Sequence, residues 1–449
     1  MSTVFLHVGQ AGNEVAAAFW KLAAAEKPPQ RYLFDARGRC RAVLVDTEAK
    51  VVRGAVASVG ADRLHPRCAL VEQGGRGNNW AMGYHGAGDA PGRGVADAAM
   101  EAVRWQVEGC DWFAGLTLCH SIGGGTGAGL GSLLLQEARD AYPSQYLTAA
   151  SLSPFAAGEL PLGFYNATLA LSFLQEYSDA VLLFDNAAML NQLAAVAATA
   201  SHASSHSSRA PPRLCMRTLD EYVARALAGL VFPTDGAAGR RPFDAGELVS
   251  SVCPMPSAKF LRLHSSPPPP PPSTSSTASS SAPSSSSSAS RAPSWETIVA
   301  DCASRLPRYD LYHKPVVSLS SVAIARGTGA EPPDARVRER VAALMGPSPV
   351  TSSSVDWKLS SSVQTALPSV GMHRSLTVAS NRCCVAAQME QLVLRAQLQL
   401  SERAYLHHYE RYGVSSDYIS SRLELVRQVG DDYAAMSSAV ARKPSRLAS

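Results

Sequence analysis

Short apolar, β-prone runs alternate with helical patterns through the first part of the chain. The runs cover residues 3–8, 41–45, 113–119, 146–152 and 179–184. A polar or glycine-containing loop follows each run, and after the first one apolar side chains recur at helical spacing over residues 13–25. Alternating strands and helices predict a parallel sheet with helices on both faces. A sheet of this kind binds its ligands outside the carboxyl ends of its strands.

The rest of the chain mixes the two patterns. Strands are predicted at residues 259–263, 315–326 and 375–379, and helices at 214–230, 295–306, 385–404 and 419–436. In the last two helices, leucine and valine recur on one face, which is typical of helices that pack on a core.

Two polar segments interrupt these patterns. Residues 265–290 contain only Ser, Pro, Thr and Ala, with six consecutive prolines at 267–272, so they are predicted to be disordered or extended. They are either a docking or phosphorylation segment or an insertion tolerated at a loop tip. Residues 200–212 predict a solvated loop, in which His202 and His206 would share a metal only if the segment were helical.

Composition narrows the class of protein. The length of 449 residues predicts two or three domains, and the net charge of +4, spread along the chain, gives no reason to expect a nucleic-acid partner. Nine cysteines without a CxxC pair or a signal peptide predict reduced thiols in a cytosolic protein. The adjacent Cys383 and Cys384 are expected to be buried apolar side chains rather than metal ligands. No run of about 18 apolar residues occurs, so we expect a soluble protein without a membrane partner.

A glycine-rich stretch covers residues 121–132, Ser-Ile-Gly-Gly-Gly-Thr-Gly-Ala-Gly-Leu-Gly-Ser. It lies between a predicted strand and a predicted helix. Glycines let backbone N–H groups approach an anion closely, and a helix N-terminus adds free donors and a favourable dipole. The stretch matches neither the Walker pattern nor the usual dinucleotide pattern. A phosphate-binding loop and a simple glycine-rich turn both remain open on this evidence.

Residues 123–129 closely resemble the signature loop of the tubulins. Four further motifs resemble nucleotide loops or contacts of that family in the same order, at residues 7–13, 43–48, 77–81, and 165–167 together with 184–186. The resemblance implies an α/β fold. It has a Rossmann-like GTPase domain with a parallel sheet (1–213), a central helix (214–233), an α+β intermediate domain carrying the Ser/Pro insertion (234–379) and a C-terminal helical region (380–449).

The resemblance also implies the ligands, GTP or GDP with Mg²⁺, and the residues that hold them. The implied nucleotide contacts are Gln10, Ala11, Asn78, Ser121, Gly124, Gly125, Thr126, Gly127, Glu159, Asn186 and Asp220. Asp46 or Glu48 would organise Mg²⁺ through water, since this ion prefers few carboxylates plus phosphate oxygens. A solvated loop carboxylate is the alternative for Glu48.

The base site departs from the family at two positions. Guanine offers N1–H and N2–H₂ donors and an O6 acceptor, and the Asn186 amide can match both kinds of group. Asp220 stands where the family has asparagine, and Met216 stands where it has an aromatic ring that stacks on the base. We expect guanine selectivity to survive and affinity to fall, because stacking on a ring is worth roughly 1 to 3 kcal/mol.

Hydrolysis in the family needs an acidic residue from the next subunit, placed before a Val-Pro-aromatic-Pro turn. Here the turn is Val252-Cys-Pro-Met-Pro256, which puts Glu247 in the catalytic position and Asp244 one helical turn earlier. The alternative is that both are ordinary residues of a surface helix.

Sequence details look most like delta-tubulin, with the zeta type next. This implies a GTP-binding cytoskeletal protein of the cytoplasm, at centrioles and basal bodies, that helps to form or maintain doublet and triplet microtubules. The implied partners are other tubulins or microtubule ends. The chain ends in a basic segment, so partners that read the glutamate-rich tails of alpha- and beta-tubulin should not recognise it. The alternative function is a nucleotide-stabilised adaptor that caps or decorates microtubules without hydrolysis.

Overall fold

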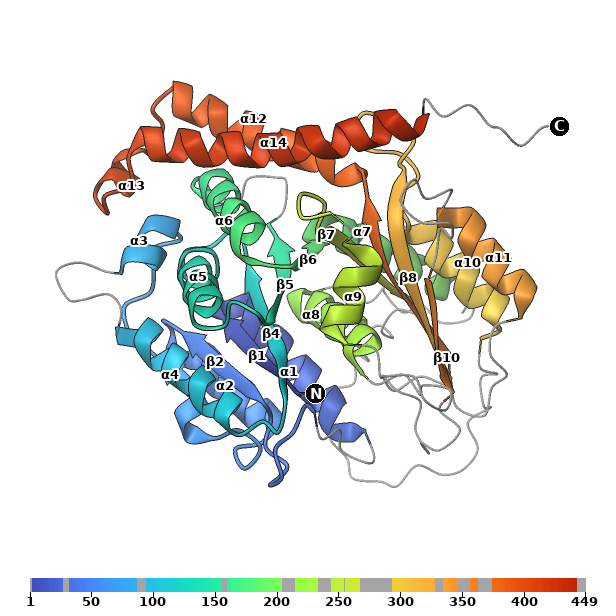
Figure 1. Cartoon of the computed structure of the whole chain (residues 1–449), viewed down its shortest axis with the longest axis horizontal. Helices are drawn as coiled ribbons and strands as arrows, with labels where there is room; N and C mark the ends of the chain where they lie inside the picture. Colours follow the sequence, from blue (N-terminus) through green and yellow to red (C-terminus); the bar gives the residue numbers. More distant parts are fainter. Residues whose placement is uncertain are drawn as a thin grey trace.

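Ten strands form one sheet in the described part of the chain, in the spatial order β3-β2-β1-β4-β5-β6-β7-β10-β8-β9 (Figure 1). The computed structural model describes residues 2–26, 32–86, 94–154, 160–203, 215–232, 244–253, 255–266, 293–327, 334–345, 356–361 and 374–441. The sheet is parallel from β3 to β7, and β10 then runs antiparallel to both β7 and β8. The predicted α/β class is therefore confirmed.

The first six strands alternate with helices, and the hydrophobic pattern predicts all of them except β3. The strands are β1 Ser2–Val8, β2 Ala42–Asp46, β3 Ala69–Val71, β4 Phe113–Ser121, β5 Tyr146–Ser153 and β6 Ala180–Asp185. The helices are α1 Gly9–Ala25, α2 Ala49–Val59, the 3₁₀ turn η1 Pro66–Cys68, α3 Trp80–His85, α4 Gly94–Glu108, the π-helical turn η2 Thr126–Leu130, α5 Gly131–Ala141, α6 Gly163–Tyr177 and α7 Asn186–Ala203. All five residues of β2 are buried, because helices cover both faces of the sheet.

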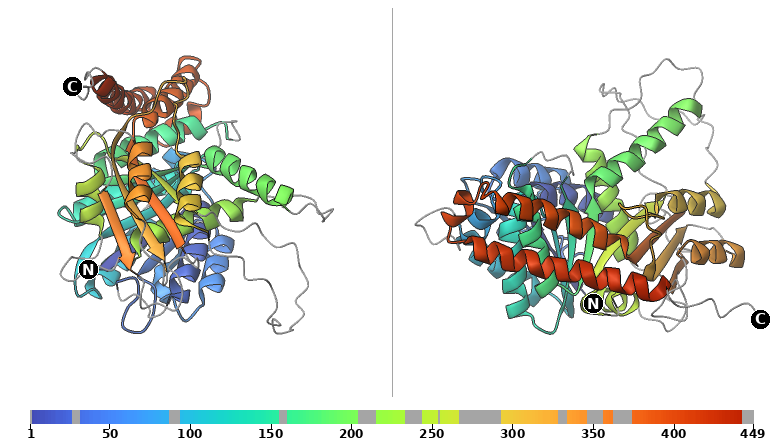
Figure 2. Two further views of the ribbon diagram at one scale, coloured as in Figure 1. Left: turned by 90° about the vertical axis from the view of Figure 1, so that its right-hand side faces the viewer. Right: turned by 90° about the horizontal axis from the view of Figure 1, so that it is seen from above.

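The second half extends the same sheet. Its strands are β7 Phe260–Ser266, β8 Ser318–Gly327, β9 Asp356–Ser361 and β10 Arg374–Arg382. Its helices are α8 Met216–Val231, α9 Ala245–Val252, α10 Trp295–Arg305, α11 Ala335–Met345, α12 Cys384–Ser401, α13 His407–Glu410 and α14 Ser416–Ala441. The long helices α12 and α14 lie side by side across one side of the molecule in every view (Figures 1 and 2). The domain boundaries proposed from sequence stay a prediction, and β6 pairs with β7 across the first two of them.

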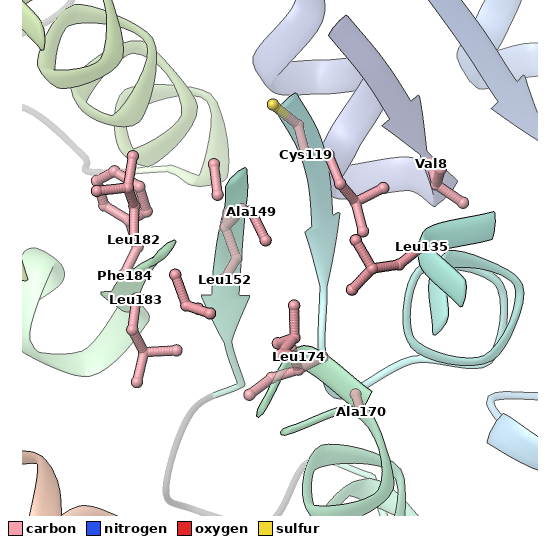
Figure 3. Packing of buried hydrophobic residues seen from close by; sticks show 14 of the residues in the cluster. Val8, Cys119, Leu135, Ala149, Leu152, Ala170, Leu174, Leu182, Leu183 and Phe184 are labelled. Carbon is pink, nitrogen blue, oxygen red and sulfur yellow. The ribbon is translucent and has the colours of Figure 1, made fainter. Parts of the chain in front are cut away.

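The main core is continuous. Figure 3 shows apolar side chains of β4, β5 and β6 meeting Leu135 of α5 and Leu174 of α6. A second, smaller cluster lies under α10 and α11 and includes Ile298, Val341 and Leu376. Burial of apolar area of this kind is the main force that holds helices on a sheet.

Two segment boundaries differ from the prediction. The insertion assigned to residues 265–290 begins later, because Ser265 and Ser266 are buried in β7 opposite Thr377 and Leu376. The loop assigned to residues 200–212 also begins later, since α7 continues to Ala203. The neighbouring strand β10 pairs with Ser265 and Ser266, which low-complexity composition alone cannot reveal. Residues 204–212 and 267–290, His206 among them, lie outside the described residues.

The remaining structural expectations concern cysteines and membranes. All nine cysteines are free, and Cys383 and Cys384 are buried as expected. The described residues contain no group of three or more His, Cys, Asp or Glu side chains that could hold a metal ion. Among the described helices, none combines the length and apolar character that a membrane span requires.

Candidate functional site

The strand register brings the predicted motif loops to one edge of the sheet. Val8, near the end of β1, lies opposite Val45 of β2 and His120 of β4. On the other side of β4, Ser121 lies opposite Leu152, and the last residues of β5 and β6 are also paired. The loops that follow these five strands therefore converge, as expected at the carboxyl edge of a parallel sheet.

The glycine-rich stretch is shorter as a loop than the sequence suggested. Only residues 122–125 form a turn, and η2 then begins at Thr126 and leads directly into α5. This turn presents backbone N–H groups at the start of a helical segment, the arrangement that favours anions. A Cβ added at Gly124 would meet nothing within 4 Å, so this glycine borders open space at the edge of the sheet.

Close backbone packing explains two of the other glycines. Gly9 has a φ of +74°, and a Cβ there would lie 2.8 Å from the Gly127 nitrogen. A Cβ on Gly127 would lie 2.8 Å from the carbonyl oxygen of Ser121. The start of α1, the end of β4 and η2 thus touch through backbone atoms, which fixes the geometry of the turn.

Hydroxyl groups join the glycine turn to the loop after β2. The Thr126 and Thr47 Oγ1 atoms are hydrogen-bonded at 2.7 Å. Ser121 Oγ accepts a hydrogen bond from the Gly123 N–H at 3.3 Å. Both Ser121 and Thr126 are partly exposed, so their hydroxyls lie at the surface of the edge and not in the core.

Two buried histidines, His7 and His120, form hydrogen bonds with the segments at this edge of the sheet. The sequence analysis did not identify them. His120 Nδ1 donates to the Gly127 carbonyl at 2.8 Å, while its Nε2 accepts from the Ser151 hydroxyl at 2.8 Å. His7 Nδ1 lies 3.0 Å from the Gly12 carbonyl, and its Nε2 accepts from Trp20 Nε1. Burial lowers the pKa of both rings to about 4, so they stay neutral. Each histidine stands one residue before the end of its strand, β1 or β4. This position next to the motif loops is the sequence feature that could have identified them.

Asn166 joins three segments that lie far apart in the sequence. Its Nδ2 donates to the Asn78 carbonyl at 2.7 Å and to the Gly123 carbonyl at 2.9 Å. Its Oδ1 accepts from the Trp80 N–H at 2.8 Å and from the Tyr409 hydroxyl at 2.6 Å. This fully buried residue lies in the motif at 165–167, where the resemblance implies ribose and base contacts. It holds loops in place and has no exposed surface for a ligand.

The third motif loop is held by an unusual backbone and by the C-terminal region. Gly77 and Asn78 both have positive φ values, of +52° and +50°. Asn79 then caps α3, with its Oδ1 accepting from the Ala81 N–H at 2.8 Å, and its Nδ2 donates to the His408 carbonyl at 2.7 Å. Asn78 is left exposed, which agrees with its predicted place as a ligand contact.

The two predicted Mg²⁺ residues lie at the end of β2 in different environments. Asp46 is 3% exposed, and its Oδ1 accepts from the Thr47 N–H at 2.7 Å, while its Oδ2 has no partner among the described residues. Burial, together with the nearby carboxylates Glu48 and Glu14, raises the pKa of Asp46 to about 6. Glu48 is exposed. A cation at this edge would satisfy the buried oxygen and favour its ionised form, so the residues fit Mg²⁺ held mainly by Asp46.

Buried acceptors without partners mark the region expected to hold the base. The Oδ1 atoms of Asn186 and Asp220 have no hydrogen-bond partner in the described chain, although the residues are only 8% and 4% exposed. The Oδ1 of Asn13 is also buried without a hydrogen-bond partner among the described residues, while its Nδ2 donates to the Gly9 and Val45 carbonyls. An unsatisfied buried acceptor costs roughly 1 to 3 kcal/mol, which a ligand with N–H donors would recover.

Other predicted contacts surround this region. Gln10 is exposed and donates to Glu14 Oε1 at 3.0 Å, and Ala11 is half-buried beside it. Met216, the first residue of α8, is 46% exposed. Its flexible thioether side chain provides no ring for stacking. Glu159 lies outside the described residues.

Glu247 is the one predicted site residue that the structure describes away from this edge. It lies in the first turn of α9, and its backbone N–H donates to Asp244 Oδ1 at 2.9 Å, so Asp244 is the helix cap. The adjacent Gly246 packs against Tyr146, the first residue of β5. Glu247 is therefore near the amino edge of the sheet, opposite the glycine turn, and cannot act on a ligand held by its own chain.

A parallel sheet whose strands end at a glycine turn, a helix start and a set of unpaired buried acceptors defines an α/β nucleotide-binding domain. Residues 2–194 match the model of the Tubulin/FtsZ family, GTPase domain.

A curated relative supports the same assignment. Over 209 residues the chain is 33% identical to the tubulin beta chain of Trichophyton rubrum. The similar region is 42% of this chain and 46% of the relative, so the chain covers less than half of that beta chain.

Proposed function

We propose that this protein is a GTP-binding cytoskeletal protein of the tubulin type. The observation that carries the proposal is the set of buried, unpartnered acceptors, Asp46, Asn186 and Asp220, beside an open glycine turn at the carboxyl edge of the sheet. A ligand with an anionic end, a bound cation and N–H donors at its other end would satisfy all of them. Guanine nucleotides with Mg²⁺ have this combination of groups.

The residues divide into three roles. Backbone N–H groups of Gly124, Gly125 and Gly127 would bind phosphate oxygens, with the start of η2 adding its dipole. Asp46 would orient Mg²⁺, which supplies charge neutralisation at the phosphates when bound. Asn186 and Asp220 would accept from the N–H groups of the guanine edge, which adenine does not present in the same arrangement.

The first experiment is to denature the purified protein and identify the released nucleotide by chromatography. GTP or GDP near one per chain is the expected result, and an empty protein would overturn the proposal. Asp220→Leu should lose the nucleotide because it removes the base acceptor. Glu221→Leu is the matched control, because it changes the neighbouring residue, whose side chain is 39% exposed and pairs with Arg217.

Hydrolysis, in this proposal, takes place between subunits. Glu247 lies near the edge opposite the glycine turn, so stacking one chain on the next in head-to-tail fashion would bring this carboxylate to a neighbour's nucleotide. A glutamate there can orient the attacking water, which is the main work left once charges are balanced. The partners required are other tubulins or the ends of microtubules.

A second candidate function is a nucleotide-stabilised adaptor that caps or decorates microtubules without turnover. The observation that favours it is Met216, which is exposed where the family stacks a ring on the base. Phosphate release that rises with assembly would support the GTPase. Stable bound GTP under the same conditions would support the adaptor.

We place the protein at centrioles and basal bodies, as a delta-type tubulin that helps to form or maintain doublet and triplet microtubules. The support is the likeness of motifs such as Gly77-Asn-Asn-Trp-Ala-Met-Gly-Tyr84 to that type. Fluorescent tagging should place the protein at these organelles, and uniform labelling of all cytoplasmic microtubules would contradict the assignment.

A further inference from the structure

The turn between α10 and β8 exposes a cluster of large apolar side chains. Tyr309, Leu311 and Tyr312 are 61%, 53% and 44% exposed. They are three of the ten large apolar side chains that are exposed in the described part of the chain, and they stand within four consecutive residues. A single exposed apolar residue is ordinary on a protein surface, whereas a cluster of them points to an interaction site.

Hydrogen bonds within the turn fix its conformation. Asp310 Oδ1 accepts from the N–H groups of Tyr312 and Lys314 at 2.9 and 2.8 Å. The Asp310 N–H donates to the Lys314 carbonyl at 2.9 Å. The Val316 N–H donates to the Arg308 carbonyl, also at 2.9 Å, and closes the base of the turn. A turn that is ordered before binding loses little conformational entropy when a partner docks on it.

The charges around the cluster favour an anionic partner. Arg308 and Lys314 flank the three apolar residues, both are exposed, and neither forms an ion pair with another described residue. The Asp310 carboxylate is turned toward the backbone N–H groups of the turn. Glu390 of α12 is a further acidic group, and it comes near Tyr312. The two unpaired cations therefore remain available to carboxylates of a partner.

Exposed apolar residues continue from this point along α12. Leu394 and Leu398 follow Glu390 at intervals of four residues, so the three share one face of the helix. The two leucines are 53% and 65% exposed. The turn and this face of α12 together carry five of the ten exposed large apolar side chains. The apolar surface is therefore elongated, which suits a peptide segment better than a compact ligand.

We propose that residues 308–315, with the adjoining face of α12, dock an acidic peptide segment of another protein that carries apolar side chains between its carboxylates. The apolar side chains of the segment pack on Tyr309, Leu311 and Tyr312, and its carboxylates pair with Arg308 and Lys314. Tyrosine and arginine are among the residue types that contribute most to binding at protein interfaces.

This surface is separate from the proposed nucleotide site. The turn precedes β8, and β8 runs in the same direction as β7, because β10 is antiparallel to both. The turn therefore lies at the amino end of its strand, whereas the glycine turn follows the carboxyl end of β4. Peptide binding should not depend on bound nucleotide.

The test is fluorescence anisotropy of the full-length protein with a dye-labelled synthetic peptide that repeats Glu-Glu-Phe. Two further peptides repeat Glu-Glu-Ser, which lacks the apolar side chains, and Lys-Lys-Phe, which reverses the charge. Only the first peptide should bind, and its affinity should fall as the ionic strength rises. Tyr309→Ser should weaken binding about tenfold. Lys314→Glu should weaken it roughly fivefold, because it replaces an attraction with a repulsion.

Trp112→Ser and Arg336→Glu are the matched controls. They change an exposed aromatic residue before β4 and an exposed arginine of α11, so both variants should bind the peptide as the wild type does. Each variant should keep the wild-type urea midpoint, because every changed side chain is exposed.

Three results would overturn the proposal. The first is failure of the Glu-Glu-Phe peptide to bind, or equal binding by the wild type and Tyr309→Ser. The second is a preference for Lys-Lys-Phe, which would indicate a basic partner. The third is self-association of the protein alone, measured by sedimentation and lost in Tyr309→Ser, which would assign the surface to a second copy. None of them bears on the nucleotide site, which the analysis of released nucleotide tests separately.

Discussion

Asn166 gives the sharpest test of how this site is held together. Its amide makes four hydrogen bonds, to the carbonyls of Asn78 and Gly123 and from the Trp80 N–H and the Tyr409 hydroxyl. The variant Asn166→Leu keeps the volume and removes all four bonds. At about 1 kcal/mol each, with a further penalty for groups left buried and unpaired, the loss is about 4 to 6 kcal/mol. That is a large fraction of the stability of most domains.

The assay is urea unfolding followed by far-ultraviolet circular dichroism, together with GDP binding in the absence of denaturant. Tyr409→Phe is the graded companion, because it removes one of the four bonds to Asn166 and should cost about 1 kcal/mol. Asn166→Leu should also weaken GDP binding, since the loops at Asn78 and Gly123 lose their common support. A cost below 1 kcal/mol for Asn166→Leu would refute the reasoning.

Further predictions concern glycines, acid stability and catalysis. Gly129→Ala should lower the free energy of unfolding by about 2 kcal/mol, because its Cβ would lie 2.1 Å from a backbone carbonyl oxygen of α3. Gly124→Ala adds a Cβ in open space, so it should keep the wild-type urea midpoint and weaken GDP binding. A lower urea midpoint for Gly124→Ala together with an unchanged midpoint for Gly129→Ala would contradict this account of glycine packing. His7 and His120 have pKa values of about 4 in place of 6.5, so their stabilising contribution is complete above pH 6.5. It is lost as pH falls toward 4, by up to roughly 1.4 kcal/mol per pH unit for each ring, and His120→Gln should flatten the measured slope. Glu247→Ala should keep nucleotide binding and reduce assembly-dependent phosphate release about 100-fold; equal release would end its catalytic assignment.

The sequence by itself determined the α/β class, the alternation of elements and the loops that carry the site. Local patterns are sufficient here, because buried parallel strands are continuous apolar runs and glycines stand where the backbone must turn or approach closely. The run over residues 113–119 predicted β4, and the glycines after it predicted the turn at its carboxyl end. Asp46 and Asp220 became candidates through the resemblance to the tubulins.

Tertiary structure decided which of those residues face open space and which support the site. The His120, Asn166 and Asn79 side chains act through partners 31 to 329 residues away, and no local pattern encodes such distant pairs. Asp220 of α8 and Glu14 of α1 come near each other only because α1 packs on α8. The strand order, which joins β6 to β7 and places α9 near the opposite edge from the glycine turn, is also set by packing of the whole sheet. Burial and neighbouring charge, which depend on the complete fold, then determine the protonation of each group.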